Sequence, residues 1–302
     1  MIIVKLIGGL GNQMFQYAFF LSILKRGISA KIDISDFDNY SLHNGFELFK
    51  IFGIKKEEQF TNEEEVATLK DLRIFFKIRK LAGKILCGNI NRFIKGSHKQ
   101  ERNYSGYYPE IYFKDNSYLE GYWQNEKYFK DIRPEILNIF TWKNVSKKNQ
   151  ELAKKMQNEN SVSIHIRRLD KPRSLKELFF RLKLNIVWRT CPKSYYINAI
   201  NRMDKLIYNP EYYIFTNNIR WARKNIKSGN NLTLVDWNRG KKSNQDLYLM
   251  SRCRHNIISM SSFSWWGAWL NRNPDKIVIA PKKWAVRFTK NLGIIPKDWI
   301  NV

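Results

Sequence analysis

Hydrophobic and polar residues follow one another along the chain in short blocks that predict strands and helices in alternation. The chain opens with an apolar run over residues 2–7, which predicts a strand, and the glycines after it predict a tight turn. A helical pattern follows over about 12–25, and another short strand is expected at 30–35. The start of the chain therefore predicts a βαβ unit.

The second half of the chain alternates more regularly between apolar strands and amphipathic helices. Strands are expected at 161–166, 211–216, 232–236, 255–260 and 276–281. Strands separated by helices indicate a parallel sheet with helices on both faces. With a polar helix at 144–161 between the halves, the pattern predicts an α/β fold of two Rossmann-like domains, 1–145 and 146–302, that face a cleft. The C-terminal tail could pack back on the first domain.

The charge of the chain limits the class of partner. Lys and Arg together number 53 against 27 Asp and Glu, which gives a net charge of +26. Such an excess favours an anionic partner, which could be a nucleic acid, a membrane surface or a phosphorylated small molecule. A helical pattern runs over about 61–86, and its basic part, around 70–86, could dock on a membrane or bury its apolar stripe in the fold. No RRM, KH or zinc signature supports a nucleic-acid-binding protein.

The spacing of cysteine and histidine residues gives no sign of a structural metal, because no CxxC pair occurs. Asp36 and Asp38 form a DxD, the pattern with which many sugar-nucleotide transferases hold a divalent metal, but a lone DxD is weak and the pair could be solvated. No apolar run approaches the roughly 20 residues that span a bilayer, and no signal-peptide pattern is evident. A cytoplasmic protein with reduced thiols is therefore expected.

The glycine turn, GLGNQM, carries part of a dinucleotide-binding fingerprint. Gly9 and Gly11 supply the first two glycines of G-x-G-x-x-G, but Met14 stands where the third allows close packing of helix and strand. This departure counts against NAD, although Asp33 stands where a ribose-binding acid could lie. Free N–H groups at a helix N-terminus favour a phosphate or sugar near Gly9, Gly11 and Asn12. A tight turn without a ligand stays open.

The second motif, HIRRLD, spans residues 165–170 at the end of a predicted strand. Ligands in open α/β sheets bind at the carboxyl ends of strands. Arg167 and Arg168 would repel each other unless an anion lies between them, and a guanidinium binds a phosphate bidentately. Asp170 could orient one of these arginines. The alternative is a surface arginine pair held by Asp170 without a ligand.

Two helix starts are further candidates. In FTNNIRW (215–221), Thr216 or Asn217 is expected as an N-cap, which needs no ligand. In SSFSWWGAWL, Ser261 and Ser262 begin a helix whose hydroxyl and N–H groups could bind an anion. The tryptophans of that helix are expected in the core rather than stacked on a base or sugar.

An aromatic loop, GYWQNEKYF, follows a short strand predicted from residue 117. Its aromatic residues include Tyr122 and Trp123, and Glu120 and Glu126 flank them.

Taken together, the motifs resemble a known family. GGLGNQMFQYA, GYWQNEKYF, HIRRLD, FTNNIRW and SSFSWWGAWL stand in the order seen in the bacterial α-1,2-fucosyltransferases of glycosyltransferase family 11. The resemblance implies a GT-B fold and an inverting transfer of L-fucose from GDP-β-L-fucose to the 2-hydroxyl of a terminal galactose, without a metal or other cofactor. It also implies a role in the synthesis of a surface polysaccharide such as an O-antigen.

The resemblance further implies roles for individual residues. The donor-binding residues that it implies are His165, Arg167, Arg168, Asp246, Ser261, Ser262 and Phe263, with Gly9, Gly11 and Asn12 across the cleft. Arg167 is expected to grip the β-phosphate, His165 to lie against the guanine or its ribose, and Asp246 to hold the N1 and N2 edge of the guanine. Leu169 stands where the family commonly has a glycine.

The acceptor implied by the resemblance could stack against Tyr122 and Trp123. A carboxylate near neutral pH would suit the removal of a proton from the acceptor hydroxyl. Glu120 and Glu126 are candidates for this general base, and Asp170 is a third, although it is expected rather to position the arginines. Water or the donor phosphate could also take the proton, so the residues do not single out one base.

Alternatives from other classes stay open. One is a fucosyltransferase of different linkage or acceptor, a second is an NAD-dependent dehydrogenase, and a third is a basic nucleic-acid or membrane-binding module without catalysis. For the fucosyltransferase, the expected partners are GDP-fucose and a galactose-terminated oligosaccharide, lipid-linked or soluble. Peripheral contact with the inner face of an anionic membrane would fit the charge, and no nucleic acid is expected.

Overall fold

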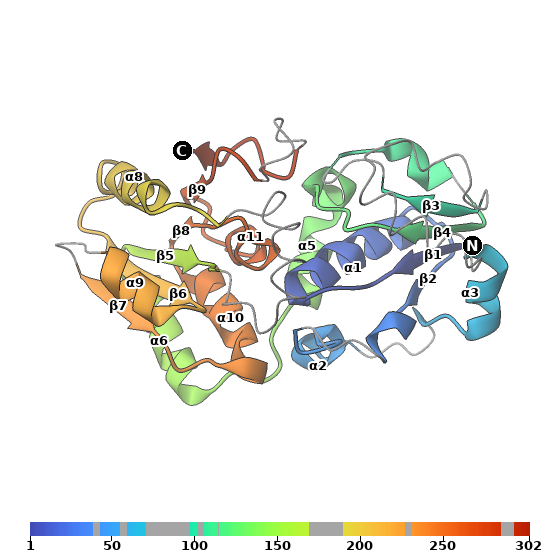
Figure 1. The fold of residues 1–302 in the computed structure, drawn as a ribbon, viewed down its shortest axis with the longest axis horizontal. Coiled ribbons are helices and arrows are strands. Elements are labelled where there is room, and N and C mark those ends of the chain that lie inside the picture. The colour runs from blue at the N-terminus through green and yellow to red at the C-terminus, as the bar shows by residue number, and fades with distance from the viewer. Residues whose placement is uncertain are drawn as a thin grey trace, which may run out of the picture. The chain divides into compact units, whose positions relative to one another are not determined.

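The computed structural model describes residues 1–38, 43–54, 59–70, 97–101, 106–113, 115–168, 190–226, 231–284 and 293–302. The chain divides into two compact units, Met1–Phe140 and Thr141–Val302 (Figure 1). Three predictions lie outside the described residues: the role of Asp170 with its neighbour Leu169, most of the helix expected over 61–86, and nearly all of the basic insertion that follows residue 170.

The first unit is built on a four-stranded parallel sheet in the order β2-β1-β4-β3. Its strands are β1 (Ile2–Lys5), β2 (Ala30–Asp33), β3 (His98–Gln100) and β4 (Ser117–Glu120). Its helices and helical turns are α1 (Leu10–Lys25), η1 (Ser35–Phe37), α2 (Leu48–Phe52), α3 (Glu63–Leu69), η4 (Pro109–Phe113), η5 (Glu126–Tyr128), η6 (Lys130–Ile132) and α5 (Arg133–Ile139). The apolar run of β1 is buried throughout, as expected for a strand with a neighbour on each side in a covered sheet.

Helix α1 begins at the predicted glycine turn and is buried over most of its surface. Gly8 takes the left-handed backbone (φ +92°) that lets the chain turn from β1 into the helix, and Gly9 is the N-cap. Helix α3 begins with a capping box, in which Asn62 accepts from the amide of Glu65 and the carboxylate of Glu65 accepts from Asn62.

The second unit is built on a six-stranded parallel sheet in the order β10-β9-β8-β5-β6-β7. Its strands are β5 (Ser161–Ile166), β6 (Glu211–Thr216), β7 (Leu232–Val235), β8 (His255–Ile257), β9 (Val278–Ala280) and β10 (Ile300–Asn301). Its helices and helical turn are α6 (Lys147–Asn158), α8 (Lys193–Asp204), α9 (Ile219–Asn225), η7 (Gly240–Lys242), α10 (Asn244–Arg252) and α11 (Ser262–Trp269). The last residues thus add an edge strand, with Ile300 paired to Ile279.

Helices cover both faces of this second sheet. Residues of α8 and α9 share one apolar cluster with the central strands, to which Tyr196 and Ala222 belong. Helix α10 contacts both α6 and α11. Right-handed crossovers predict this division, and Figure 1 shows α8 and α10 on opposite sides of the sheet. Among the helices that the described ranges contain, none has the length and hydropathy of a membrane span.

Both sheets have a topological switch point, where successive connections leave in opposite directions. In the second unit the chain runs from β5 to β6 and β7 on one side, then returns to β8 and β9 on the other. In the first unit the corresponding point lies between β1 and β4. Open α/β sheets bind ligands outside the carboxyl ends of the strands at such points. The predicted α/β class with two Rossmann-like, parallel-sheet domains is confirmed.

Candidate active site

His165 lies in β5, one residue before the strand ends at the switch point of the second sheet, and is buried. Its Nδ1 is hydrogen-bonded to Oγ of Ser259, which follows β8, at 2.8 Å. The imidazole also packs against Phe263, with 5.8 Å between the ring centroids. Burial, with a smaller effect of the nearby Arg167 charge, lowers the pKa of His165 to about 3. The imidazole is therefore neutral at physiological pH and ties the HIRR segment to the start of α11.

The two arginines that follow β5 differ in environment. The side chain of Arg167 is exposed, whereas Arg168 is half-buried. The guanidinium of Arg168 lies 4.5 Å from the ring centroid of Trp221, and its Nη1 donates to the carbonyl of Cys191 at 3.1 Å. The protein thus fixes Arg168 and presents Arg167 to solvent at the carboxyl end of the strand.

Asn217 also fixes this segment, because its side chain binds both backbone groups of Arg168. Its Oδ1 accepts from the amide of Arg168 at 2.9 Å, and its Nδ2 donates to the carbonyl at 2.8 Å. The N-cap of α9 is Asn218, whose Oδ1 accepts from the amide of Trp221 at 2.9 Å. The prediction that Thr216 or Asn217 caps this helix was therefore wrong, since the cap lies one residue later.

Sequence reasoning missed Asn217 and Trp221 as supports of the arginine pair. A signal was available in the doubled asparagine of FTNNIRW, because one helix needs only one N-cap. The asparagine that does not cap the helix, Asn217, could therefore be expected to bind a different partner. The motifs HIRR and FTNNIRW are thus parts of one arrangement at the ends of β5 and β6.

Helix α11 presents a polar end and a buried end. Ser261 is its N-cap but makes no side-chain cap hydrogen bond within the described residues, and Ser261, Ser262 and Phe263 are partly exposed. The predicted core positions of the tryptophans are confirmed, since Trp265, Trp266 and Trp269 are buried. The indole of Trp265 donates to the carbonyl of Ile294 at 2.7 Å and packs 5.6 Å from the ring of Trp299. The amide groups of the first turn are therefore held in place from behind.

Asp246 lies in the first turn of α10 and is held by a chain of amides. Asn238 donates to its Oδ1 at 2.8 Å, and Asn149 donates to Asn238 at 2.9 Å. The indole of Trp237 donates in turn to Asn149 at 2.8 Å. Burial raises the pKa of Asp246 to about 7, against the opposing effect of the Asn238 hydrogen bond. A largely buried carboxylate whose pKa lies near neutrality is typical of a functional position.

The glycine turn of the first unit meets the aromatic loop at the switch point between β1 and β4. The side chain of Gln124 donates to Oδ1 of Asn12 at 2.8 Å, and that of Gln16 donates to the carbonyl of Gly121 at 2.9 Å. Gly9 and Asn12 are partly exposed, whereas Gly11 is buried in the first turn of α1. The side chain of Asn12 thus positions the loop as well as lining the turn.

The structure corrects one predicted acceptor residue. Trp123 is 1% exposed and stacks on Phe19 with 4.6 Å between centroids. The ring of Tyr128 packs edge-on against the ring of Trp123, with 5.9 Å between the centroids. The prediction that Trp123 stacks against an acceptor was therefore wrong, because its ring belongs to the core. Its backbone is left-handed (φ +55°), and Oε2 of Glu101 accepts from the amides of Tyr122 at 2.7 Å and Trp123 at 3.3 Å, which stabilises this turn.

The other acceptor candidates lie nearer to solvent. Tyr122, Glu120 and Glu126 are partly exposed, and Glu126 begins η5. Glu120 lies 3.2 Å from Nε2 of His98 and 3.8 Å from Nζ of Lys5. The carboxylate of Glu120 therefore belongs to a charged cluster at the carboxyl end of β4.

The DxD lies beside this cluster. Nζ of Lys5 contacts the carboxylate of Asp36 at 2.6 Å, and Asp38 is exposed. Asp33 is buried, and hydrogen bonds from Tyr118 and Ser35 hold its pKa below the usual value although burial acts in the opposite direction. Across the described residues, no three His, Cys, Asp or Glu side chains gather closely enough to hold a metal ion.

The whole chain, residues 1–302, matches the family model described as Glycosyl transferase family 11. The protein belongs to this family. It is similar over its full length to an Escherichia coli alpha-1,2-colitosyltransferase, at 31% identity and with 98% of the relative covered. It is also similar to the Escherichia coli O-antigen biosynthesis glycosyltransferase WbnK, at 29% identity with 98% of each chain covered.

A more distant similarity is to the mouse galactoside 2-alpha-L-fucosyltransferase Sec1, at 25% identity over 50% of this chain and 41% of the relative. This family 11 protein is therefore a glycosyltransferase, and the enzyme class that its motifs predicted is confirmed. A nucleotide-sugar donor and a glycan acceptor are the substrate classes of such an enzyme. Membership of this family excludes the two alternatives from other classes, the NAD-dependent dehydrogenase and the non-catalytic binding module.

Proposed function

We propose that this family 11 glycosyltransferase moves L-fucose from GDP-β-L-fucose, with inversion, to the 2-hydroxyl of a terminal galactose in a glycan. Two relatives carry the linkage in their names, one as an alpha-1,2-colitosyltransferase and one as a galactoside 2-alpha-L-fucosyltransferase. The name of WbnK supports a surface polysaccharide as the product. The acceptor would be a galactose-terminated oligosaccharide, either lipid-linked or soluble.

One observation carries the donor part of the proposal. At the switch point of the second sheet, an exposed Arg167 follows a buried, neutral His165 that is bonded to Ser259 and packed on Phe263 at the start of α11. A guanidinium and a helix N-terminus therefore serve the same carboxyl edge of the sheet. Both groups bind phosphate, the first bidentately and the second through free N–H groups.

The chemistry of the transfer explains why fixed positive groups are needed. Cleavage of the bond between fucose and phosphate leaves negative charge on the GDP. Arg167 and the N–H groups of α11 would stabilise that charge as it forms, since their positions are set before the reaction. His165 would act as a neutral partner to the nucleotide, because its lowered pKa prevents it from contributing a positive charge.

The remaining assignments complete the proposed complex. Asp246, as a carboxylate, would accept from N1–H and N2–H of guanine, and Ser261 and Ser262 would contact the phosphates. Tyr122, with Glu120 or Glu126, would contact the acceptor, and a carboxylate would take the proton of its hydroxyl. We further propose that turnover needs no metal, and that the enzyme works in the cytoplasm with peripheral contact to the inner membrane face.

The experiment is an incubation with GDP-fucose, EDTA and a panel of galactosides, followed by mass spectrometry and assignment of the linkage by NMR. A parallel reaction with GDP-colitose tests the second candidate donor, which the 31%-identical relative favours. Colitose is L-fucose without its 3-hydroxyl, so the two donors would share every diphosphate contact. Product from GDP-fucose with a 2-linked galactose in EDTA supports the proposal, and product from GDP-colitose alone overturns the fucose assignment.

Arg167→Lys tests the role of the arginine, because lysine keeps the charge and loses the planar fork. Loss of such a preorganised group lowers kcat by about 10²–10³. Arg202→Lys, at an exposed position of α8, is the matched control and is expected to leave kcat unchanged. A folded Arg167→Lys enzyme with near-normal kcat would refute the assignment.

A further inference from the structure

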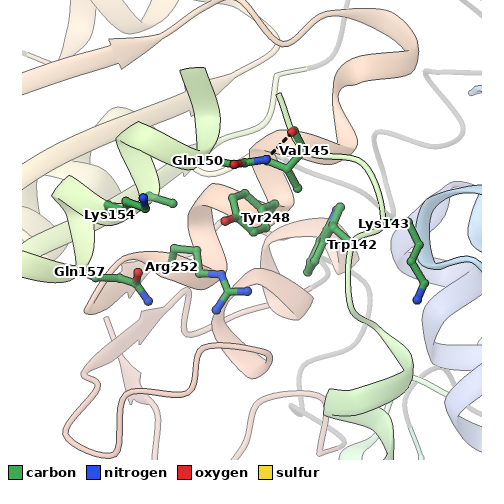
Figure 2. A pocket seen from close by; sticks show the side chains of 9 residues that line it. Trp142, Lys143, Val145, Gln150, Lys154, Gln157, Tyr248 and Arg252 are labelled. Carbon is green, nitrogen blue, oxygen red and sulfur yellow. Dashed lines mark hydrogen bonds between the residues drawn. The ribbon is translucent and has the colours of Figure 1, made fainter. Parts of the chain in front are cut away.

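A hollow of about 370 Å³ lies in the second unit, apart from the residues assigned to the donor. It is bounded by α6, by α10 and by the chain segment that follows Phe140 (Figure 2). Asp246 lies in the first turn of α10, whereas Arg252, which lines the hollow, ends the helix. Tyr248, which also lines the hollow, follows Asp246 by two residues and so lies about 200° around the helix from it, and Arg252 follows by six residues, about 9 Å along the axis. The hollow and the proposed guanine contact are therefore distinct places on one helix.

Two aromatic rings form one wall of the hollow. The rings of Trp142 and Tyr248 pack edge to face, with 5.6 Å between centroids and 69° between planes. The indole of Trp142 is fixed by a hydrogen bond of 3.2 Å to the carbonyl of Asn244. Both rings are only partly buried. Partly exposed aromatic rings in fixed positions are suited to packing against the C–H face of a sugar ring.

The rest of the lining is basic. Lys143, Lys154 and Arg252 line the hollow, and no acidic residue is among the described residues that do so. Figure 2 shows Tyr248 between Arg252 and Trp142, with Lys154 and Gln157 projecting from α6. The guanidinium carbon of Arg252 lies 5.0 Å from the ring centroid of Tyr248. Positive charge thus gathers beside the aromatic wall, where it attracts an anion.

Arg252 supplies a second sign of a ligand. Its Nε is buried and has no hydrogen-bond partner among the described residues. A buried donor without an acceptor costs free energy, and a ligand oxygen would remove that cost once the side chain turned Nε–H toward the hollow. Nε–H and the adjacent Nη–H of an arginine point in parallel and match two oxygens of one phosphate.

We propose that this hollow binds a glycosyl phosphate, with the sugar ring on Trp142 and Tyr248 and the phosphate on Arg252. Lys143 and Lys154 add charge, and the amide of Gln157 is available to a sugar hydroxyl. A bare anion would leave the aromatic wall unused, and a neutral sugar would leave the cations unpaired. The glycosyl phosphate is either a soluble metabolite or the head of a lipid-linked saccharide.

The test is isothermal titration of glucose 1-phosphate into the whole protein saturated with GDP, so that the proposed donor site is blocked. Arg252→Gln is expected to weaken binding about tenfold or more, as loss of a charged hydrogen bond does. The affinity of Arg252→Lys for glucose 1-phosphate is expected to lie between those of Arg252→Gln and the wild type. Trp142→Ala is expected to weaken binding about fivefold or more, in line with loss of one stacked ring. Arg202→Gln on α8 removes the same charge at an exposed site and is expected to leave binding unchanged.

Inorganic phosphate and methyl glucoside separate the two halves of the ligand, and each is expected to bind about tenfold or more weakly than glucose 1-phosphate. Vesicles that carry a polyprenyl-phosphate-linked glucose, compared with phosphatidylglycerol vesicles of equal charge, show whether the source is lipid or soluble. Three results would overturn the proposal: no saturable binding, equal affinity for inorganic phosphate, or equal weakening by Arg202→Gln. The thermal shift with GDP is measured separately on every variant. Loss of GDP binding can therefore be told apart from loss of glycosyl phosphate binding in the hollow.

Discussion

Asp246→Asn should make the protein more stable at alkaline pH while it weakens donor binding. The carboxylate of Asp246 is partly buried in the first turn of α10, and burial raises its pKa from 3.8 to about 7. Asparagine has nearly the same shape, and its Oδ1 can still accept the 2.8 Å hydrogen bond from Asn238. The substitution therefore removes a buried negative charge and leaves the contacts around it largely in place.

The sign and the size follow from the two pKa values. Between about pH 4 and pH 7 the folded protein keeps a proton on Asp246 that the unfolded chain has lost, so this carboxyl lowers stability progressively as the pH rises. Above pH 7 the full cost is present. The difference between 3.8 and about 7 corresponds to about 4 kcal/mol at 1.36 kcal/mol per pKa unit. Solvent screening of a partly exposed group reduces the expected effect to about 2 kcal/mol.

The assay is urea unfolding followed by tryptophan fluorescence at pH 4.5 and pH 8.0. The variant is expected to exceed the wild type by about 2 kcal/mol at pH 8.0 and to match it within about 0.5 kcal/mol at pH 4.5. GDP affinity of the wild type should rise with pH through about 7, since only the carboxylate accepts from both N–H groups of guanine. A variant of equal or lower stability at pH 8.0 would refute the reasoning from burial.

Two further substitutions test the packing behind the site. Gly267→Ala places a Cβ about 2.9 Å from Cβ of Met250 where α11 crosses α10, so it should cost about 1–3 kcal/mol in urea unfolding, and wild-type stability would contradict that close approach. Asn217→Ala removes both side-chain hydrogen bonds to the backbone of Arg168, so kcat should fall about tenfold or more while the fold persists by circular dichroism, and an unchanged kcat would show that this clamp is dispensable.

The regular second half of the chain was predictable because its central strands are buried on both faces. The strands expected at 161–166 and 211–216 match β5 and β6 in both bounds. Such strands form near-continuous apolar runs, which stand out between polar helices. The tryptophans of α11 followed from the same reasoning, since rings at helical spacing normally pack into a core.

The first unit was harder to predict, because its features depend on contacts between distant parts of the chain. Trp123 stands in a loop rich in aromatic and polar residues, where no periodicity shows which ring points inward. Its backbone is set by Glu101, and its ring by Phe19 on α1. The short strands β3 and β10 contain too few residues to show an alternating pattern.

The sequence predicted the motifs of the candidate site but not the contacts between them. HIRRLD pointed to an anion site, but the support of Arg168 by Asn217 and Trp221 depends on which strands are neighbours. The order of strands in a sheet depends on pairing between distant segments, so no single motif predicts it. The hollow beside Trp142 is likewise formed by segments that no local pattern connects.

The final residues of the chain brace α11 from behind, through the carbonyl of Ile294 and the ring of Trp299 against Trp265. Because Trp265 is the fourth residue of α11, loss of these contacts would displace the N-terminal end of the helix, where the leaving diphosphate is proposed to lie. A trimmed C-terminus could leave every polar residue of the site intact and still slow the enzyme. Affinity tags are accordingly better placed elsewhere.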